Sequence, residues 1–251
     1  MALVSGAGGP MGRAIALKLA AEGASLLLTD ISAGRLDASA SQIEAAAPEA
    51  RGIADRVLAV RANAMERAEV AAVVEAGLAR FGRIDVLVNV VGGIRGASLY
   101  TPFLQLDEVQ WDATFALNLK PGFHLIQFVA PGMLQRGSGK IVNVASVVYA
   151  GEGGQADYAA AKASVASLTR SLAQEFAPHV RVNCIAPGLI RTSVVERLAE
   201  SERQGFLDKS LLRRLGEPDE IADAVAFLCS DESSFMTGEI LAVSGGNHPG
   251  L

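Results

Sequence analysis

The chain has 251 residues, half of them apolar, with 22 Lys and Arg against 27 Asp and Glu and a formal net charge of −5. This much apolar material is enough for the core of one large domain. The acidic balance, with no basic run, argues against nucleic acid or an anionic membrane as a partner.

The cysteines and histidines are few and scattered. Cys184 and Cys229 lie far apart in apolar surroundings, so we expect free buried thiols and a cytoplasmic, reducing location. No histidine has a carboxylate or Cys at ligand spacing, so no catalytic metal is expected. Neither a signal peptide nor an apolar run of about 18 residues is visible, so we expect no secretion and no membrane span.

Short β-branched or Leu-rich runs alternate along the chain with longer amphipathic stretches. The expected strands are residues 2–5, 25–29, 57–61, 86–90, 140–144, 181–185 and 239–243, and the expected helices are residues 11–22, 35–46, 67–81, 111–134, 158–176 and 221–229. Alternation of this kind predicts an α/β fold with a doubly wound parallel sheet in a single domain, residues 1–251. Ligands of such sheets bind beyond the carboxyl ends of the strands, so the site is expected in the loops that follow them.

A glycine-rich segment follows the first expected strand and opens the first helix: Ser-Gly-Ala-Gly-Gly-Pro-Met-Gly, residues 5–12. There, backbone N–H groups and the helix dipole can face a pyrophosphate. A tight strand-to-helix turn would also need glycine, so the loop alone leaves both interpretations open.

Asp30 ends the second expected strand, 18 residues after Gly12. An acidic side chain at that place accepts hydrogen bonds from a ribose diol, and it would repel the 2′-phosphate of NADP. The alternative is that Asp30 caps the following helix. With the glycine loop, Asp30 favours NAD as the cofactor over NADP.

Tyr158 and Lys162 stand one helical turn apart on the same face of an expected helix. A nearby cation favours the phenolate, so Lys162 is expected to lower the pKa of Tyr158 from about 10 and to make it an acid–base group. An isolated pair of this kind is more often a half-buried ring beside a solvated ammonium. The other motifs of the chain therefore decide between the two.

Several motifs occur together in one order, and in that order they resemble the classical short-chain dehydrogenases/reductases over essentially the whole chain. Besides the glycine loop and the Tyr–Lys pair, the matching segments are Asn89-Val90-Val91-Gly92, Pro187-Gly188-Leu189-Ile190-Arg191-Thr192, Ser146 and Asn118. The resemblance implies a seven-stranded Rossmann-type sheet and an NAD(P)-dependent oxidoreductase. Secondary alcohol dehydrogenases and 3-oxoacyl-carrier-protein reductases are the similar members.

The same resemblance implies the catalytic roles. Tyr158 would exchange a proton with the substrate oxygen, which Ser146 would hold, while Lys162 would donate to the nicotinamide ribose. Asn118 would bend its helix and hold a water for proton relay. Taken singly, Ser146 is more typical of a turn and Asn118 of a helix surface.

The cofactor contacts are implied in the same way. Asn63 would read the adenine amino group through its amide oxygen, and Asn89 would brace the centre of the sheet. The Pro-Gly segment can also be an ordinary turn with Thr192 as a helix cap. The full set of expected cofactor residues is Ser5, Gly6, Gly8, Met11, Gly12, Asp30, Asn63, Ala64, Asn89, Gly92, Tyr158, Lys162, Pro187, Gly188, Ile190 and Thr192.

Three features depart from the family pattern. Pro10 replaces a glycine and supplies no backbone N–H, although proline is tolerated in the first turn of a helix, so we expect that helix to form. Val90 and Val91 add bulk beside the cofactor, and Ser146 lies one residue closer to Tyr158 than is usual. None of these changes removes a catalytic group.

The substrate pocket is expected between the loop after the fourth strand, the loop after Ser146 and a lid at about residues 192–212. Val148, Leu189 and residues 194–195 would form an apolar wall that suits a small-molecule secondary alcohol or ketone, and Arg95 and Glu152 are the charges that could read a polar group. The long helices 111–134 and 158–176 are expected to pair across a two-fold axis in a homotetramer.

Two other functions stay open. A 3-oxoacyl-carrier-protein reductase would need a basic docking patch, for which Arg136, Lys140, Arg213 and Arg214 are the candidates. A nucleotide-binding scaffold or sensor without turnover is favoured only by Pro10 and the two valines.

Overall fold

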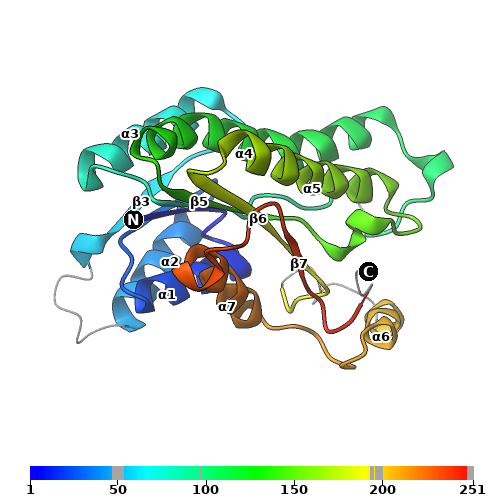
Figure 1. Ribbon diagram of the computed structural model, residues 1–251. Coiled ribbons are helices and arrows are strands. Elements are labelled where there is room, and N and C mark those ends of the chain that lie inside the picture. The colour runs from blue at the N-terminus through cyan, green and yellow to red at the C-terminus, as the bar shows by residue number, and fades with distance from the viewer. Residues whose placement is uncertain (47–53, 97, 193–194, 196–199, 248–251) are drawn as a thin grey trace.

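The computed structural model describes residues 1–46, 54–96, 98–192, 195 and 200–247. Its centre is one sheet of seven parallel strands in the order β3-β2-β1-β4-β5-β6-β7 (Figure 1). The strands are β1 (Ala2–Ser5), β2 (Leu26–Asp30), β3 (Val57–Arg61), β4 (Val86–Asn89), β5 (Gly139–Val144), β6 (Val180–Pro187) and β7 (Ile240–Val243). Strand order reverses between β1 and β4, the place where such sheets bind ligands. The expected doubly wound α/β sheet is confirmed.

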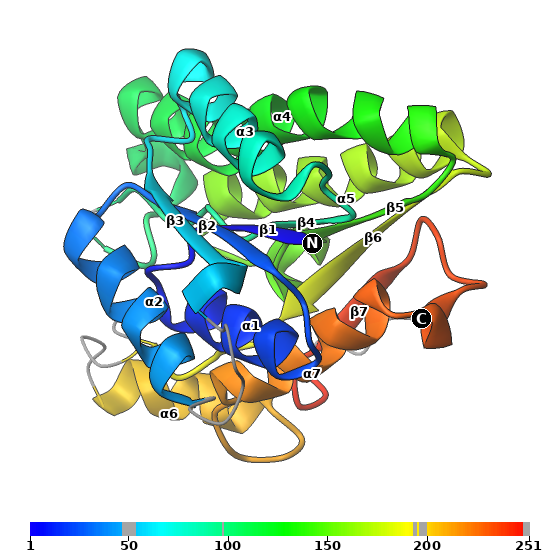
Figure 2. The same cartoon turned by 90° about the vertical axis from the view of Figure 1, so that its left-hand side faces the viewer.

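Helices cover both faces of the sheet (Figures 1 and 2). One layer consists of α1 (Pro10–Ala21), α2 (Ala33–Ala46) and α7 (Pro218–Cys229), and the other of α3 (Arg67–Phe81), α4 (Glu108–Arg136) and α5 (Ala156–Phe176). Each layer packs on its own apolar cluster, which explains why the central strands are continuous apolar runs. In β2, Leu26 and Leu28 point into the first cluster and Leu27 into the second.

The expected elements agree with the observed ones to within a few residues. The helices begin one to three residues earlier than expected where a capping residue or proline starts them. Asp107 caps α4 by accepting from the Gln110 N–H at 2.7 Å, and Pro218 occupies the first turn of α7. One helix was not expected, α6 (Glu200–Lys209), because its sequence is almost entirely polar and shows no apolar periodicity.

Both cysteines are free and buried, as expected. Among the residues that the structure describes, no helix is long and apolar enough to cross a bilayer, and no three His, Cys, Asp or Glu side chains gather as a metal site would require.

Candidate active site

The turn between β1 and α1 leaves no room for side chains at two of its glycines. A Cβ added to Gly12 would overlap the carbonyl of Gly6, and one added to Gly8 would lie 2.9 Å from the carboxyl carbon of Asp30. Gly6 itself has φ +67°, which favours glycine. The helix begins at Pro10 despite the missing N–H, as expected. The turn therefore presents bare backbone at a helix N-terminus, a cradle that fits a pyrophosphate.

Asp30 lies beside this turn at the end of β2 and is only 8% exposed. One carboxylate oxygen accepts from the Gly8 N–H at 3.0 Å, and the other accepts from the Ser32 N–H at 2.9 Å and from the Arg35 guanidinium at 3.3 Å. Asp30 thus joins the glycine turn to β2, and Arg35 is a cation at the same place. Arg35 side-chain pairing was not foreseen from the sequence.

The loops after β3 and β4 hold the next expected cofactor residues. Asn89 donates to Asn143 at 2.9 Å and so joins β4 to β5. The amide oxygen of Asn63 accepts from the Met65 N–H at 3.1 Å. An Asx turn therefore uses one lone pair of this oxygen, and the second remains for the adenine amino group that the resemblance assigns to it.

The four expected catalytic side chains come together at the carboxyl ends of β4 and β5. The Lys162 ammonium lies 5.7 Å from the centre of the Tyr158 ring and donates to the Val144 carbonyl at 2.9 Å. Ser146 follows β5, and its hydroxyl lies close enough to Tyr158 to lower the pKa of the phenol. A Cβ at Gly92 would lie 2.9 Å from the Lys162 nitrogen and 2.6 Å from the Asn118 amide oxygen. Residues from four separate segments of the sequence thus lie around Gly92.

Asn118 holds the loop after β4. Its oxygen accepts from the Gly93 N–H at 3.0 Å, and its nitrogen donates to the carbonyls of Gly93 and Thr114, both at 2.8 Å. Both N–H groups of the amide are therefore engaged by protein. The water that the resemblance assigns to Asn118 finds no side-chain N–H left to bind it.

Burial sets the acid–base properties of the Tyr–Lys pair. It raises the pKa of Tyr158 to about 12, partly offset by the hydrogen bond from Ser146. It lowers the pKa of Lys162 to about 8. The expectation that Lys162 lowers the pKa of Tyr158 is thus wrong for the protein alone, because desolvation of the phenol outweighs other influences. At neutral pH Tyr158 is a proton donor.

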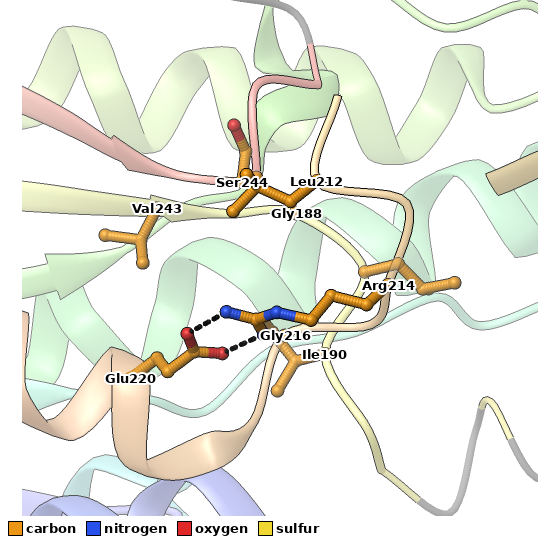
Figure 3. Close-up of a pocket in the computed structure, with 10 residues that line it drawn as sticks. Gly188, Ile190, Leu212, Arg214, Gly216, Glu220, Val243 and Ser244 are labelled. Atoms are coloured by element: carbon orange, nitrogen blue, oxygen red, sulfur yellow. Dashed lines mark hydrogen bonds and ion pairs between the residues drawn. The ribbon is translucent and has the colours of Figure 1, made fainter. Parts of the chain in front are cut away.

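The Pro-Gly segment follows β6 and packs against the end of β7 (Figure 3). Gly188 has no room for a Cβ, which would lie 2.8 Å from the Cα of Ser244, and Ile190 is buried beside Gly216. The cavity here, about 40 Å³, is far below the few hundred Å³ of a cofactor site. Leu189 lines this cavity, and at its rim Arg214 makes two bonds to Glu220, at 2.6 and 2.7 Å. Thr192 is half-buried at the end of the segment.

The expected substrate residues lie in different loops, and one of them contacts α6. Val148 is buried after Ser146, Arg95 is exposed in the loop after β4, and Glu152 binds Lys209 of α6 at 2.7 Å. Glu152 thus ties the loop after β5 to α6 through one of its oxygens. Of the expected lid, residues 193–194 and 196–199, including one member of the apolar wall, lie outside the described residues.

An aromatic pair at the same place was missed by the sequence analysis. Tyr100, in the loop after β4, stacks on Phe206 of α6 with ring centroids 6.0 Å apart. The Thr101 N–H donates to the Gly154 carbonyl at 2.7 Å, which joins the loops after β4 and β5. The one available signal was Phe206, an aromatic residue in an otherwise polar segment. The helix α6 thus covers both loops, as a lid would.

The parallel sheet, the glycine turn and the Tyr–Lys pair together define the class of Rossmann-type oxidoreductases. Comparison with known proteins is more specific. A family model described as enoyl-(acyl carrier protein) reductase matches residues 6–248. The chain belongs to the short-chain dehydrogenase/reductase family.

Three relatives illustrate the similarity. The chain is 40% identical to the 3-oxoacyl-[acyl-carrier-protein] reductase FabG of Thermotoga maritima, over 97% of this chain and 96% of that protein. It is 39% identical to the (2S)-[(R)-hydroxy(phenyl)methyl]succinyl-CoA dehydrogenase subunit BbsD of Thauera aromatica, over 98% and 95%. A solved 7α-hydroxysteroid dehydrogenase, complexed with NADH and 7-oxo glycochenodeoxycholic acid, superposes with a TM-score of 0.89 at 32% identity, over 98% of this chain and 93% of that one.

Proposed function

We propose that the protein is an NAD-dependent oxidoreductase that interconverts a secondary alcohol and a ketone, with Tyr158 as the general acid and base. The observation that carries the proposal is the convergence of Ser146, Tyr158, Lys162 and Asn118 beside Gly92. A phenol with a pKa of about 12 gives its proton to the oxygen of a ketone as that oxygen becomes an alkoxide. Ser146 lies beside the phenol, and its single O–H would turn from Tyr158 to donate to the same substrate oxygen.

The bound dinucleotide would supply or accept the hydride. The bare backbone of the glycine turn fits its pyrophosphate, and Asp30 fits a ribose diol. The Asp30 carboxylate would repel a 2′-phosphate and so supports NAD over NADP. The exposed Arg35 guanidinium, 3.3 Å from the same carboxylate, is a cation that would attract a 2′-phosphate, so the comparison of NADH with NADPH tests which of the two groups dominates. The relative whose structure was solved with NADH lends further support.

Reduction of a 3-oxoacyl group on a carrier protein is the second candidate, supported by the names of relatives at 40 and 38% identity. The four candidate docking cations do not support it. Arg136 and Lys140 lie near the start of β5, at the opposite end of the sheet from the catalytic residues, and they bind the Ile84 carbonyl and Asp231. Arg213 and Arg214 bind Asp208 and Glu220.

A scaffold or sensor without turnover is the candidate of another class. Its support was Pro10 and the two valines, and the helix that begins at Pro10 weakens that support. The proposal also includes a homotetramer paired through α4 and α5, which sedimentation of the purified protein would test.

The proposal is tested by two measurements in sequence. Equilibrium affinities for NADH and NADPH, followed by quenching of Trp111 fluorescence, should show a clear preference for NADH. A panel of hydrophobic ketones, 3-oxoacyl-CoA thioesters and 3-oxoacyl carrier protein is then reduced with the preferred cofactor. Turnover of the free ketones supports the proposal, turnover only of the carrier-bound substrate supports the second candidate, and binding without any turnover supports the sensor.

A further inference from the structure

Asp157 is a buried carboxylate directly before Tyr158 and is not one of the four convergent catalytic side chains. It is 3% exposed, and within the described residues it has no Lys, Arg or His partner. One of its oxygens accepts from the Tyr158 backbone N–H at 2.8 Å. The other accepts from the Thr114 hydroxyl at 2.9 Å and from the Gln110 amide at 3.2 Å. Asp157 thus joins the first turn of α5 to α4.

The two partners on α4 connect Asp157 to the rest of the site. The Thr114 carbonyl accepts from Asn118, which in turn holds Gly93. The Gln110 amide lies against Gly96, where an added Cβ would come within 2.9 Å of its nitrogen. One hydrogen-bonded network therefore runs from the backbone of Tyr158 through α4 to the loop that borders the substrate side.

The hydrogen-bond donors of this network favour a carboxylate at position 157. Three donors converge on this side chain, and a carboxylate is the side chain that only accepts. A buried carboxylate without a cation is unfavourable unless hydrogen bonds satisfy it, as these do. Asparagine can replace it if the Gln110 amide turns round and the Thr114 hydroxyl rotates, because both groups can donate or accept.

We propose that Asp157 is a positioning residue of the reaction: its hydrogen bonds to α4 fix Tyr158 relative to Asn118 and to the loop after β4. The proposal rests on the proposed function of Tyr158 as the acid and base. The helices α4 and α5 lie side by side along their length, so the clamp acts at the end of their contact that bears the reactive groups (Figures 1 and 2).

The test compares three variants. Asp157→Ala removes the clamp, and Asp157→Asn keeps its shape. Asp107→Ala is the matched control, because Asp107 caps the same start of α4 through the Gln110 N–H, and the hydrogen bonds among the described residues include none from its side chain to α5. For the ketone that the panel selects, we expect kcat of Asp157→Ala to fall about 10- to 100-fold, the loss that a small misplacement of a reacting group brings. Asp157→Asn should recover most of kcat. The NADH affinity of all three variants should stay within about twofold of wild type, and the pH dependence of kcat should keep the apparent pKa values of wild type.

Other outcomes overturn the proposal. An equal loss of kcat in Asp107→Ala would mean that any weakening of α4 suffices, and unchanged kcat in Asp157→Ala would mean that no clamp is needed. A shifted pH limb, with Asp157→Asn as impaired as Asp157→Ala, would assign the effect to charge. If wild type turns over nothing, the proposed function fails, and the role of Asp157 in the reaction fails with it. Hydrogen exchange then decides only whether the clamp joins the helices: faster exchange of the α5 amides beyond Tyr158 in Asp157→Ala than in Asp107→Ala supports the link, and equal exchange rejects it.

Discussion

The two halves of the site are built in different ways. In the half around the β1–α1 turn and Asp30, the decisive feature is bare glycine backbone, since Gly8 and Gly12 have no space for a Cβ. In the half around Tyr158, the decisive feature is buried polar side chains from α4, α5 and the loop after β5. The first half is a shape formed by backbone, and the second is a set of chemical groups.

This difference separates binding from chemistry. Changes in the first half should act on dinucleotide affinity, and changes in the second half on turnover with affinity retained. The variants below either break that separation or sharpen it.

The largest effect is expected from Tyr158→Phe, which removes the acid and base and keeps the ring. General acid–base catalysis contributes about 10²- to 10⁴-fold, so kcat should fall by about that much, measured as ketone reduction under saturating NADH. NADH affinity should stay within about twofold. A variant that loses affinity as much as turnover would show that the two halves are not separate.

Gly12→Ala is the matching change in the other half. Its Cβ would overlap the Gly6 carbonyl, so the turn must move, and we expect dinucleotide affinity to fall at least about tenfold. Gly34→Ala is the control, because nothing lies within 4 Å of an added Cβ there and alanine favours a helix. If Gly12→Ala binds NADH as wild type does, the glycine turn is not the phosphate site.

Lys162→Met tests the second half through stability. Burial lowers the pKa of Lys162 from 10.5 to about 8, which corresponds to roughly 3 kcal/mol of penalty on the charged form. Methionine has a similar length and no charge, but it also removes the hydrogen bond to the Val144 carbonyl, which offsets about 1 kcal/mol of the gain. The melting temperature of the cofactor-free protein should therefore rise modestly at pH 7 while turnover is lost.

The sign of the pH dependence follows from the direction of that shift. The folded pKa is the lower one, so the penalty is fully present below about pH 8 and disappears as the pH rises towards 10.5. The stability gain of Lys162→Met should therefore shrink over that interval. Lys18→Met, at a half-buried lysine that is ion-paired at the surface, should show no gain, and an equal gain there would reject the burial argument.

The sequence predicted the fold and the location of the site because both depend on local patterns. Apolar runs that alternate with amphipathic stretches specify parallel strands. The glycines that follow β1, and the spacing of one turn between Tyr158 and Lys162, are both visible without a structure. Features that depend on packing were not predicted correctly or at all. The direction of the Tyr158 pKa shift depends on how deeply the fold buries the phenol, and α6, which packs over the site, has no apolar face to mark it in the sequence. Asp157 meets Thr114 across 43 residues of sequence, which no spacing rule connects.

The smallest effect is expected from Glu220→Gln. Glu220 lies in neither half of the site, although it borders the Pro-Gly segment (Figure 3). Arg214 and the Glu217 N–H hold the pKa of Glu220 at about 2, so its contribution to stability is present above pH 4.5 and is lost as the pH falls towards 2. The pair is largely exposed, so its loss should lower the melting temperature by only about 2 °C at pH 7. Since Gly188 and Ile190 are held by their own backbone contacts, NADH affinity and kcat should not change. A change in NADH affinity in this variant would extend the dinucleotide half of the site to the start of α7, and the division between binding and chemistry would then need a third region.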